Sequence, residues 1–247
     1  MPDNAVAENV LGTLGTVCWM VQLLPQVWKS WREKSTEGLS DYLVLLWSIA
    51  AWFLGVYAIV QDLNVPLIIQ PQIFGFLTLL SWAQCQYYGR KRPLKVCVTL
   101  FATIMLCQAG FEVGMVYAVR PSFRAGNIRG TQFFGIMASV LLSLGLFPQY
   151  YEIYRYREVI GISIPFMMID LLGGVFSALS LVFKPKFDVI AGVAYSLVVV
   201  LDGIVILLAL ILNPLARRRR QRAAAAFPTE EVPVSEASMN TVHDVAE

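Results

Sequence analysis

Two aspartates lie inside long apolar segments of the sequence. Asp170 interrupts the run 160–183, and Asp202 interrupts the next run, 187–212. A charged side chain in membrane hydrocarbon costs about 3 kcal/mol or more, so such acids usually serve a pathway or a proton relay. Low-dielectric surroundings favour the neutral carboxyl form, and a second nearby acid favours it further for one of the pair. We therefore predict that both aspartates bind and release protons, with a hydrogen-bonded structural role as the alternative.

The two acids are expected at similar depth in the membrane. At about 1.5 Å per residue, Asp170 lies ~12 Å and Asp202 ~15 Å from the same membrane face. Two carboxyl groups at this depth on consecutive helices could share one cavity. The pair Gly173-Gly174 follows Asp170 and would let a neighbouring helix or a solute approach the backbone. A proton and a small-molecule substrate are therefore the expected partners, with the lipid bilayer around them.

Two Pro-Gln pairs, Pro25-Gln26 and Pro148-Gln149, occur in equivalent parts of the two halves of the chain. Proline inside a helix has no N–H and clashes with the carbonyl four residues back, so one carbonyl in each helix loses its partner. Glutamine offers two donors and an acceptor beside that break. In lipid such groups must be satisfied by protein or water, which favours a position beside a cavity. We predict a hinge at each pair; the alternative is that proline ends the span near the interface.

Weaker candidates for the cavity lining are Trp47, Tyr57 and Gln72, although aromatic residues in spans more often lie in a core or at an interface. Glu112 also falls inside a span, between two glycines spaced four residues apart. It lies nearer the opposite membrane face from the two aspartates. We interpret Glu112 as structural, through helix packing or a salt bridge.

The sequence offers no set of residues typical of catalysis or metal binding. The single histidine, His243, lies in a polar tail, and the four cysteines form no CxxC pair. No nucleophile–base set or phosphate-binding loop occurs. We expect no enzyme activity, no catalytic residues, no metal, no cofactor and no nucleic-acid partner.

The apolar segments that carry these residues predict helices that cross a membrane. The chain of 247 residues is 57% hydrophobic and 15% charged, with a mean hydropathy of +0.62. Runs of roughly 20 apolar residues can cross about 30 Å of hydrocarbon as helices and are about twice as long as barrel strands. We predict an all-α membrane protein with seven transmembrane helices. Their expected ranges are 9–28, 41–61, 66–88, 96–119, 131–151, 162–183 and 187–212.

The distribution of Lys and Arg predicts the orientation in the membrane. The connectors after the first, third and fifth helices and the C-terminal tail carry 14 of these residues, against 5 on the other face. Cytosolic loops are enriched in Lys and Arg, so the N-terminus is expected in the lumen and the C-terminus in the cytosol. Arg120, Arg124 and Arg129 lie on the lumenal side against this trend, and we interpret them as interfacial anchors or as part of a lumenal face.

A shift of 123 residues aligns the two halves of the chain. The aligned pairs are Pro25 with Pro148, Gln26 with Gln149, Gly38 with Gly161, and Ser40 with Ser163. Each repeat holds three spans, and one helix between them restores the direction of the chain, so both repeats have the same orientation. This predicts two parallel three-helix bundles, helices 1–3 and 5–7, joined by helix 4, with the substrate site between them. The acids are confined to the second bundle, since Asp170 aligns with Trp47 and Asp202 with Leu79.

The predicted division of the chain follows from these repeats. It comprises a lumenal N-terminus (1–8), the first repeat (9–89), the linker helix with its loops (90–130), the second repeat (131–212) and a cytosolic tail (213–247). Basic residues at 217–222 could bind anionic lipid headgroups, or they could simply mark the cytosolic end of the last helix. The remainder of the tail is expected to be disordered.

Taken together, these motifs resemble those of the PQ-loop repeat family, the superfamily that includes cystinosin, vacuolar and lysosomal exporters of cationic amino acids, and SWEET sugar transporters. The resemblance covers about residues 9–212 and is nearest to the shorter fungal-type members. The elements that carry it are Leu24-Pro25-Gln26 with the following segment 34–40, Phe147-Pro148-Gln149 with Gly161-Ile162-Ser163, and the run Asp170–Ser177.

The resemblance implies that Asp170 is the proton-coupling acid and that Asp202 matches a family aspartate in the last helix. It also implies export from an acidic vacuole or lysosome. Phe166 stands where cystinosin carries an asparagine that helps to bind cystine, so Phe166 is placed in the substrate cavity. Cystine itself is therefore not the expected cargo.

We predict a proton-coupled transporter of a small polar solute, an amino acid or a derivative, that works by alternating access in a vacuolar or lysosomal-type membrane. The intramembrane acids distinguish it from a passive sugar facilitator, which has no need of them. The second hypothesis is a seven-helix nutrient receptor that binds its ligand without transporting it. The third is a membrane scaffold. The oligomeric state is not fixed by these features.

Overall fold

The computed structural model describes residues 4–63, 65–183 and 189–226, and all regular structure in that part of the chain is helical. The elements are α1 (Ala5–Val21), α2 (Leu24–Glu33), α3 (Asp41–Val60), α4 (Val65–Gln84), the π-helical turn η1 (Cys85–Gly89), α5 (Leu94–Arg124), α6 (Arg129–Tyr156), α7 (Ile164–Val182) and α8 (Val189–Ala226). The predicted all-α class is confirmed for the described residues.

Six helical segments are long and apolar enough to cross a membrane, so the chain is a multi-pass membrane protein. They are α1 together with α2, then α3, α5, α6, α7 and α8. The predicted third span corresponds to α4, which has 20 residues but is not among these six. A total of seven spans therefore stays a prediction.

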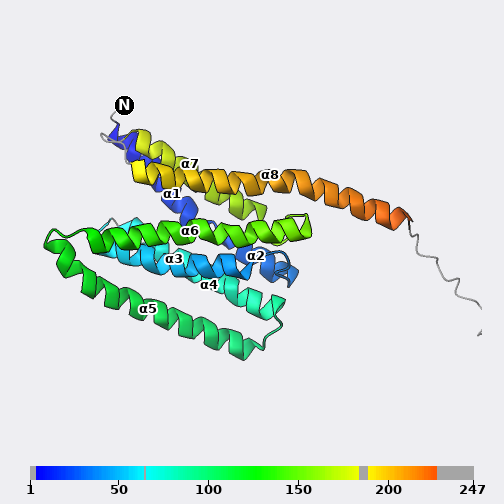
Figure 1. Ribbon diagram of the computed structural model, residues 1–247, viewed down its shortest axis with the longest axis horizontal. Coiled ribbons are helices and arrows are strands. Elements are labelled where there is room, and N and C mark those ends of the chain that lie inside the picture. The colour runs from blue at the N-terminus through cyan, green and yellow to red at the C-terminus, as the bar shows by residue number, and fades with distance from the viewer. Residues whose placement is uncertain (1–3, 64, 184–188, 227–247) are drawn as a thin grey trace, which may run out of the picture.

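The helices form two groups that lie side by side (Figure 1). One group contains α1, α7 and α8, and the other contains α3, α4, α5 and α6. The most extensive contacts join the two sequence repeats, α1 against α7 and α3 against α6. Within the repeats, α4 contacts both α1 and α3, and α8 contacts both α6 and α7. The same pattern of neighbours thus recurs in both halves, as the 123-residue repeat leads one to expect.

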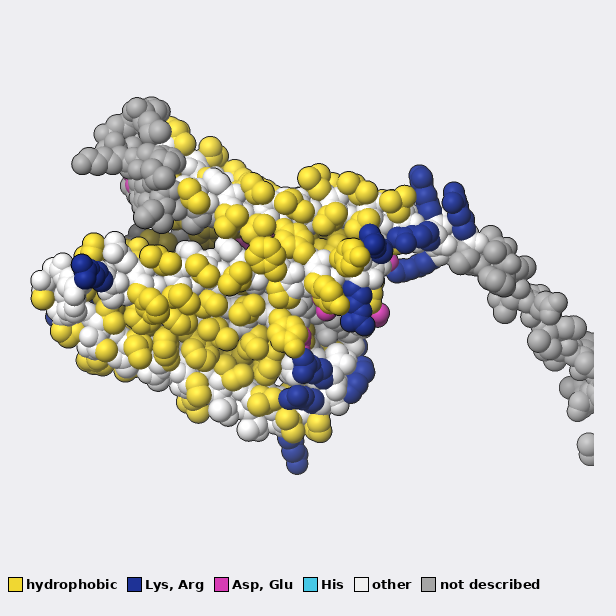
Figure 2. All heavy atoms as spheres, in the orientation of Figure 1, with side chains coloured by type: hydrophobic (Ala, Val, Ile, Leu, Met, Phe, Trp, Pro, Cys, Tyr) yellow, Lys and Arg dark blue, Asp and Glu magenta, His cyan; other side chains and the backbone are white. Residues whose placement is uncertain are grey.

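Basic side chains gather at one end of the molecule, which we name the basic end (Figure 2). They come from the segments after α2 and η1, from the last turns of α6 and from the end of α8. Its exposed members include Lys34, Arg90, Arg92, Arg155, Arg157 and Arg217–Arg220. Because these segments meet at one end, the described residues form a strongly cationic surface there, beyond the apolar belt.

The two Pro-Gln helices differ at their prolines. α1 ends at Val21 and α2 begins at Leu24, so the first helix is interrupted just before Pro25. Pro25 has no N–H to offer the Val21 carbonyl, which explains the interruption. By contrast, α6 runs through Pro148 to Tyr156 as one helix. The helix is therefore interrupted in the first repeat and continuous in the second, and a hinge at either pair stays a prediction.

The ends of these helices are nevertheless built alike. Lys34 is the C-cap of α2 and Arg157 is the C-cap of α6. Both residues have a left-handed backbone conformation, with φ of +51° and +52°. Their cations lie over the rings of Trp31 and Tyr154, at 4.4 and 4.5 Å from the ring centres. Residues other than glycine seldom adopt this backbone conformation. Its recurrence at positions 123 residues apart shows that the turn after each Pro-Gln helix has the same construction.

The last helix is longer than predicted. The predicted disordered tail begins at residue 213, whereas α8 continues through Pro214 and the arginines to Ala226. Arginine and alanine are strong helix formers, and the preceding span already supplies the helical nucleus. The rest of the predicted tail, 227–247, lies outside the described residues and includes His243.

Candidate functional site

The side chain of Gln149, on α6, binds the connector between α2 and α3. Its Oε1 accepts a hydrogen bond from the Ser40 N–H at 3.0 Å, and its Nε2 donates to the Gly38 carbonyl at 2.9 Å. Gln149 is 1% exposed. Ser40 is also the N-cap of α3, because its Oγ accepts from the Leu43 N–H at 3.4 Å. The glutamine of the second repeat thus holds the start of α3 in the first.

Gln26, on α2, makes the equivalent bonds from the first repeat to the connector of the second. Its Oε1 accepts from the Ser163 N–H, and its Nε2 donates to the Gly161 carbonyl at 3.1 Å. Gln26 is completely buried. We name Gln26, Gln149 and the two connectors that they bind, 38–40 and 161–163, the glutamine clasp. The prediction placed both amides beside a cavity, whereas here each one is buried against the backbone of the opposite repeat.

The two connectors of the clasp touch each other through glycines. A Cβ added to Gly38 would lie 2.8 Å from the Gly161 nitrogen, so neither position has room for a side chain. Lys29 strengthens one side, because its Nζ donates to the carbonyls of Ile160 and Ile162. Its repeat equivalent is an acid, Glu152, so the two halves of the clasp are not identical. The connector 161–163 is the more firmly held.

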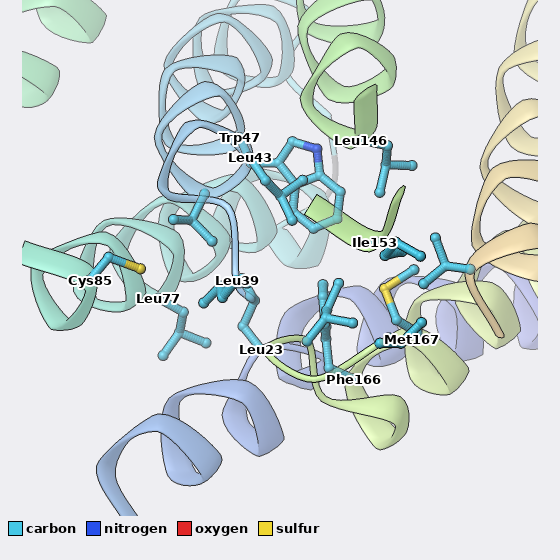
Figure 3. Close-up of a cluster of buried hydrophobic side chains, with 14 of the residues drawn as sticks. Leu23, Leu39, Leu43, Trp47, Leu77, Cys85, Leu146, Ile153, Phe166 and Met167 are labelled. Carbon is cyan, nitrogen blue, oxygen red and sulfur yellow. The ribbon is translucent and has the colours of Figure 1, made fainter. Parts of the chain in front are cut away.

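Apolar side chains fill the space beside the clasp, between α3, α6 and α7 (Figure 3). The indole N–H of Trp47 donates to the Leu142 carbonyl at 2.8 Å, and the ring of Phe166 meets the Trp47 ring edge-on at 5.7 Å. We name this group the apolar plug; its members are Leu43, Trp47, Leu146, Phe166 and Met167, all of them buried. Trp47 and Phe166, predicted to line the substrate cavity, lie here in direct contact with each other.

Asp170 and Asp202 lie together one helical turn beyond the plug, since Asp170 follows Phe166 by four residues on α7. Asp170 is 5% exposed and Asp202 is fully buried. The two carboxyl groups are within interaction distance of each other. In residues 4–63, 65–183 and 189–226, no basic side chain forms an ion pair with either acid. Neither carboxylate oxygen of Asp202 has a hydrogen-bond donor within those residues.

The aromatic side chain of Trp19, on α1, closes one side of the acid pair. Its indole N–H donates to the main-chain carbonyl of Asp170 at 3.3 Å, and its ring packs on Tyr195 at 5.5 Å between ring centres. Gly173 makes this possible, because a Cβ there would lie 2.5 Å from the Trp19 ring. The predicted close approach at Gly173 is thus made by a neighbouring helix.

Tyr150, on α6, lies near Asp202. Its O–H donates to the Leu201 carbonyl at 2.6 Å, and it is near enough to Asp202 to interact with its charge. Gly174 faces α8, where a Cβ would lie 2.9 Å from a methyl group of Val199. Tyr150 and Trp19 were not among the predicted site residues, because only tertiary packing brings them to the acid pair.

Tyr57 and Gln72, the remaining predicted cavity residues, lie away from the acid pair. The Tyr57 ring packs against Gly135, where an added Cβ would lie 2.9 Å from the ring. Gln72 donates to Glu112 Oε2 at 2.7 Å, and Gln108 donates to Glu112 Oε1 at 3.0 Å. The structure therefore joins Gln72 to a separate polar cluster between α4 and α5.

The same cluster contains Glu112, for which helix packing or a salt bridge was predicted. The expected salt bridge is not formed in the described part of the chain, where the partners of Glu112 are two amides. The flanking glycines, Gly110 and Gly114, have no neighbouring atom within 4 Å of an added Cβ. Close helix packing at that pair is therefore not observed within the described residues, and the carboxyl group itself makes the contact.

Replacing Glu112 with alanine is expected to destabilise the fold by about 2–3 kcal/mol, since the side-chain N–H groups of buried Gln108 and half-buried Gln72 would lose their acceptor. Glu112→Gln keeps the volume and one acceptor and should cost less. Thermal unfolding in detergent measures both. Glu37→Ala, at an exposed acid, is the matched control and should unfold like the wild type. Equal midpoints for Glu112→Ala and Glu37→Ala would contradict the structural role.

The profile of the PQ loop repeat matches residues 7–67 and 131–201, which together make up more than half of the chain. The chain belongs to the PQ-loop repeat family. Each matched segment of this PQ-loop protein contains one glutamine of the clasp, and the second also contains Asp170. The predicted resemblance is thereby confirmed.

Individual PQ-loop relatives extend the comparison. An uncharacterized protein of Schizosaccharomyces pombe is 40% identical over 92% of this chain and 78% of its own length. The vacuolar histidine transporter YPQ3 of Saccharomyces cerevisiae is 30% identical over 35% of this chain and 30% of its own length. Cystinosin of Drosophila melanogaster is 25% identical over 70% of this chain and 48% of its own length. The matches thus cover less than half of each of these two relatives.

Proposed function

We propose that this PQ-loop protein is a proton-coupled transporter of a small polar solute, an amino acid or a derivative, in a vacuolar or lysosomal-type membrane. Transport proceeds by alternating access between the two repeats. The observation that carries the proposal is the buried pair of Asp170 and Asp202, which has no basic partner among the described residues.

The chemistry of this pair favours joint binding of a proton and an ammonium group. Two negative charges so close together in a low dielectric repel strongly, and one proton held between them removes most of that repulsion. The second charge then needs a cation, and the Asp202 oxygens need a donor. One proton and the ammonium group of one solute neutralise the pair together. Burial of the site during transport is then favourable only when both are bound, which couples their movement.

The glutamine clasp and the apolar plug supply the gate. They close the path between the acid pair and the basic end, and neither contains an acid. Release toward the basic end requires the bonds of Gln26 and Gln149 to break and the connectors 38–40 and 161–163 to separate. The interruption before Pro25 gives the first repeat a backbone joint at which α2 can turn.

The relatives support the solute class and the membrane. They include a vacuolar histidine transporter and cystinosin, and the relatives named for an activity are transporters rather than enzymes. The proposed topology has seven spans, with α4 as the third, in two parallel three-helix repeats joined by α5, although in space α1 groups with α7 and α8, and α6 with α3 and α4. The basic end faces the cytosol because cytosolic segments are rich in Lys and Arg. The N-terminus then lies in the lumen and the C-terminus in the cytosol.

Purified protein in proteoliposomes tests the proposal. Labelled amino acids are screened one at a time for uptake with and without an inwardly directed acid gradient. We expect at least one solute to accumulate above its external concentration only when the gradient is present. Saturable binding without uptake would favour a nutrient receptor instead, and uptake of sugars that ignores the gradient would favour a passive facilitator.

Removing one glutamine of the clasp is expected to weaken the closed state. Gln149→Ala leaves the buried Ser40 N–H and the half-buried Gly38 carbonyl without a partner, at a cost of up to about 1–3 kcal/mol for each group. Gln26→Ala should cost about as much, because it leaves the Ser163 N–H and the Gly161 carbonyl without their partner. Thermal unfolding in detergent measures the loss, with the exposed Gln132→Ala as the matched control. A Gln149→Ala protein that unfolds at the wild-type temperature would contradict the clasp.

A further inference from the structure

The end of α8 is fixed against the connector between α6 and α7. The side-chain amide of Asn213 pairs with the backbone of Val159 in both directions: Oδ1 accepts from the N–H at 2.8 Å, and Nδ2 donates to the carbonyl at 3.1 Å. One turn and a half further along, Arg219 donates to the Arg157 carbonyl at 3.2 Å. The basic extension of α8 is therefore held in place at the basic end rather than pointing freely into solvent.

A groove of about 400 Å³ lies between this part of α8 and the connector. Leu210 and Pro214 line its apolar side, and Asn213, Glu158, Arg217 and Arg220 line its polar side. The lining thus changes from apolar to basic along the helix. This gradient matches a ligand with an apolar part and a charged head.

The charges of the groove are only partly balanced within the protein. Arg220 forms an ion pair with Glu158. Arg217 lines the same groove but has no hydrogen bond or ion pair within residues 4–63, 65–183 and 189–226. The two arginines and one carboxylate leave one net positive charge, which a single anionic group could neutralise. Guanidinium groups bind phosphate oxygens well, since they present several N–H donors in one plane.

The position of the groove along α8 suits the surface of a membrane. With 38 residues α8 is about 57 Å long, nearly twice the hydrocarbon thickness of about 30 Å. Its apolar part ends at Leu212, and the groove spans that boundary, with Leu210 on one side and Arg217 on the other. A molecule in the groove would therefore have its charged group at the depth of lipid headgroups.

We propose that this groove binds an anionic glycerophospholipid, with the headgroup phosphate between Arg217 and Arg220 and the upper acyl carbons against Leu210. The single net charge favours a lipid such as phosphatidylinositol. Phosphatidylcholine is disfavoured, because its quaternary ammonium group would face the two guanidinium groups. This site is separate from the acid pair and does not depend on the transport proposal.

Lipid binding to the full chain in neutral detergent tests the site. Titration with mixed micelles of phosphatidylinositol or phosphatidylcholine, followed by native mass spectrometry, gives the affinity for each lipid. Arg217→Gln removes a guanidinium group that makes no hydrogen bond or ion pair within the described residues, so the fold should be unaffected. Arg218→Gln is the matched control, with the same loss of charge on the same helix but outside the groove.

We expect Arg217→Gln to weaken phosphatidylinositol binding about tenfold, and Arg218→Gln to change it by less than about twofold. Equal losses in the two variants would overturn the site in favour of diffuse charge. Equal affinity of the wild type for the two lipids would overturn the headgroup assignment. Displacement of phosphatidylinositol by inorganic phosphate alone would also overturn it, since the groove would then be a site for a free anion.

Discussion

Gly161→Ala is expected to open the basic end of the protein. A Cβ at this position would overlap the backbone of Gly38 and Leu39, which cannot move aside as a flexible side chain could. Overpacking of this kind costs about 3 kcal/mol, which corresponds to a shift of about 100-fold in the equilibrium between closed and open connectors. Because the overlap exists only while the connectors 38–40 and 161–163 touch, separation of the two connectors relieves it.

Thiol labelling measures this opening. Ser163→Cys, in a background without the native cysteines, places a small reporter at a residue that is 4% exposed in the closed clasp. Labelling by a membrane-impermeant reagent should become about 100-fold faster when Gly161→Ala is added. Gly114→Ala is the matched control, because no atom lies within 4 Å of a Cβ there, and it should leave the rate unchanged. Equal labelling rates in the two variants would show that the connectors are not in contact.

Asp170→Asn is expected to abolish solute accumulation driven by a pH gradient while leaving solute exchange in place. Asparagine has nearly the same shape but cannot take up a proton, so only the coupling is removed. For one coupled proton, each unit of pH gradient supports about tenfold accumulation of solute in the wild type. The variant should show no accumulation above the external concentration. Its counterflow of labelled against unlabelled solute should persist.

The control for this variant is another aspartate outside the acid pair. Asp62 is exposed and lies 3.7 Å from Arg120 at the end opposite the basic end. Asp62→Asn should accumulate solute like the wild type. Undiminished gradient-driven accumulation in Asp170→Asn would remove Asp170 from the coupling mechanism. Loss of both accumulation and counterflow would show instead that Asp170 is needed for the fold or for solute binding.

The helices could be predicted from the sequence because lipid leaves the backbone few choices. Apolar runs of membrane length must satisfy their own N–H and carbonyl groups, and a helix does so locally. The ends of the helices were harder to predict from the sequence. Composition changes sharply at Asn213-Pro214, yet α8 continues to Ala226, because proline only removes one helical bond and the following residues favour helix.

The pairing within the clasp could not be read from the alignment of repeats alone. The shift of 123 residues aligns Gln26 with Gln149 and Gly38 with Gly161, but it does not say which group binds which. The structure pairs each glutamine with the connector of the other repeat, over more than 100 residues of sequence. Such long-range pairing depends on how α1 packs on α7 and α3 on α6, which no local pattern encodes.

The acid pair likewise combines residues that the local sequence indicates with residues that only tertiary packing brings together. An acid in an apolar run stands out by the cost of its burial, so Asp170 and Asp202 could be singled out from composition. Trp19 and Tyr150, which flank them, are ordinary residues of a membrane span and gain their positions only from tertiary packing. Conversely, Trp47 was predicted to line the cavity as an aromatic residue inside a span and Phe166 through the family resemblance, and the two rings pack together in the apolar plug.

The central claim is that the Asp170–Asp202 pair carries a proton together with the solute. Proton movement itself is the most direct measurement, using proteoliposomes with a trapped pH-sensitive dye and no imposed pH gradient or membrane potential. Addition of a transported solute outside should acidify the interior with the wild type and with Asp62→Asn, and should leave it unchanged with Asp170→Asn. Entry of solute into wild-type proteoliposomes without any change in internal pH would contradict the account.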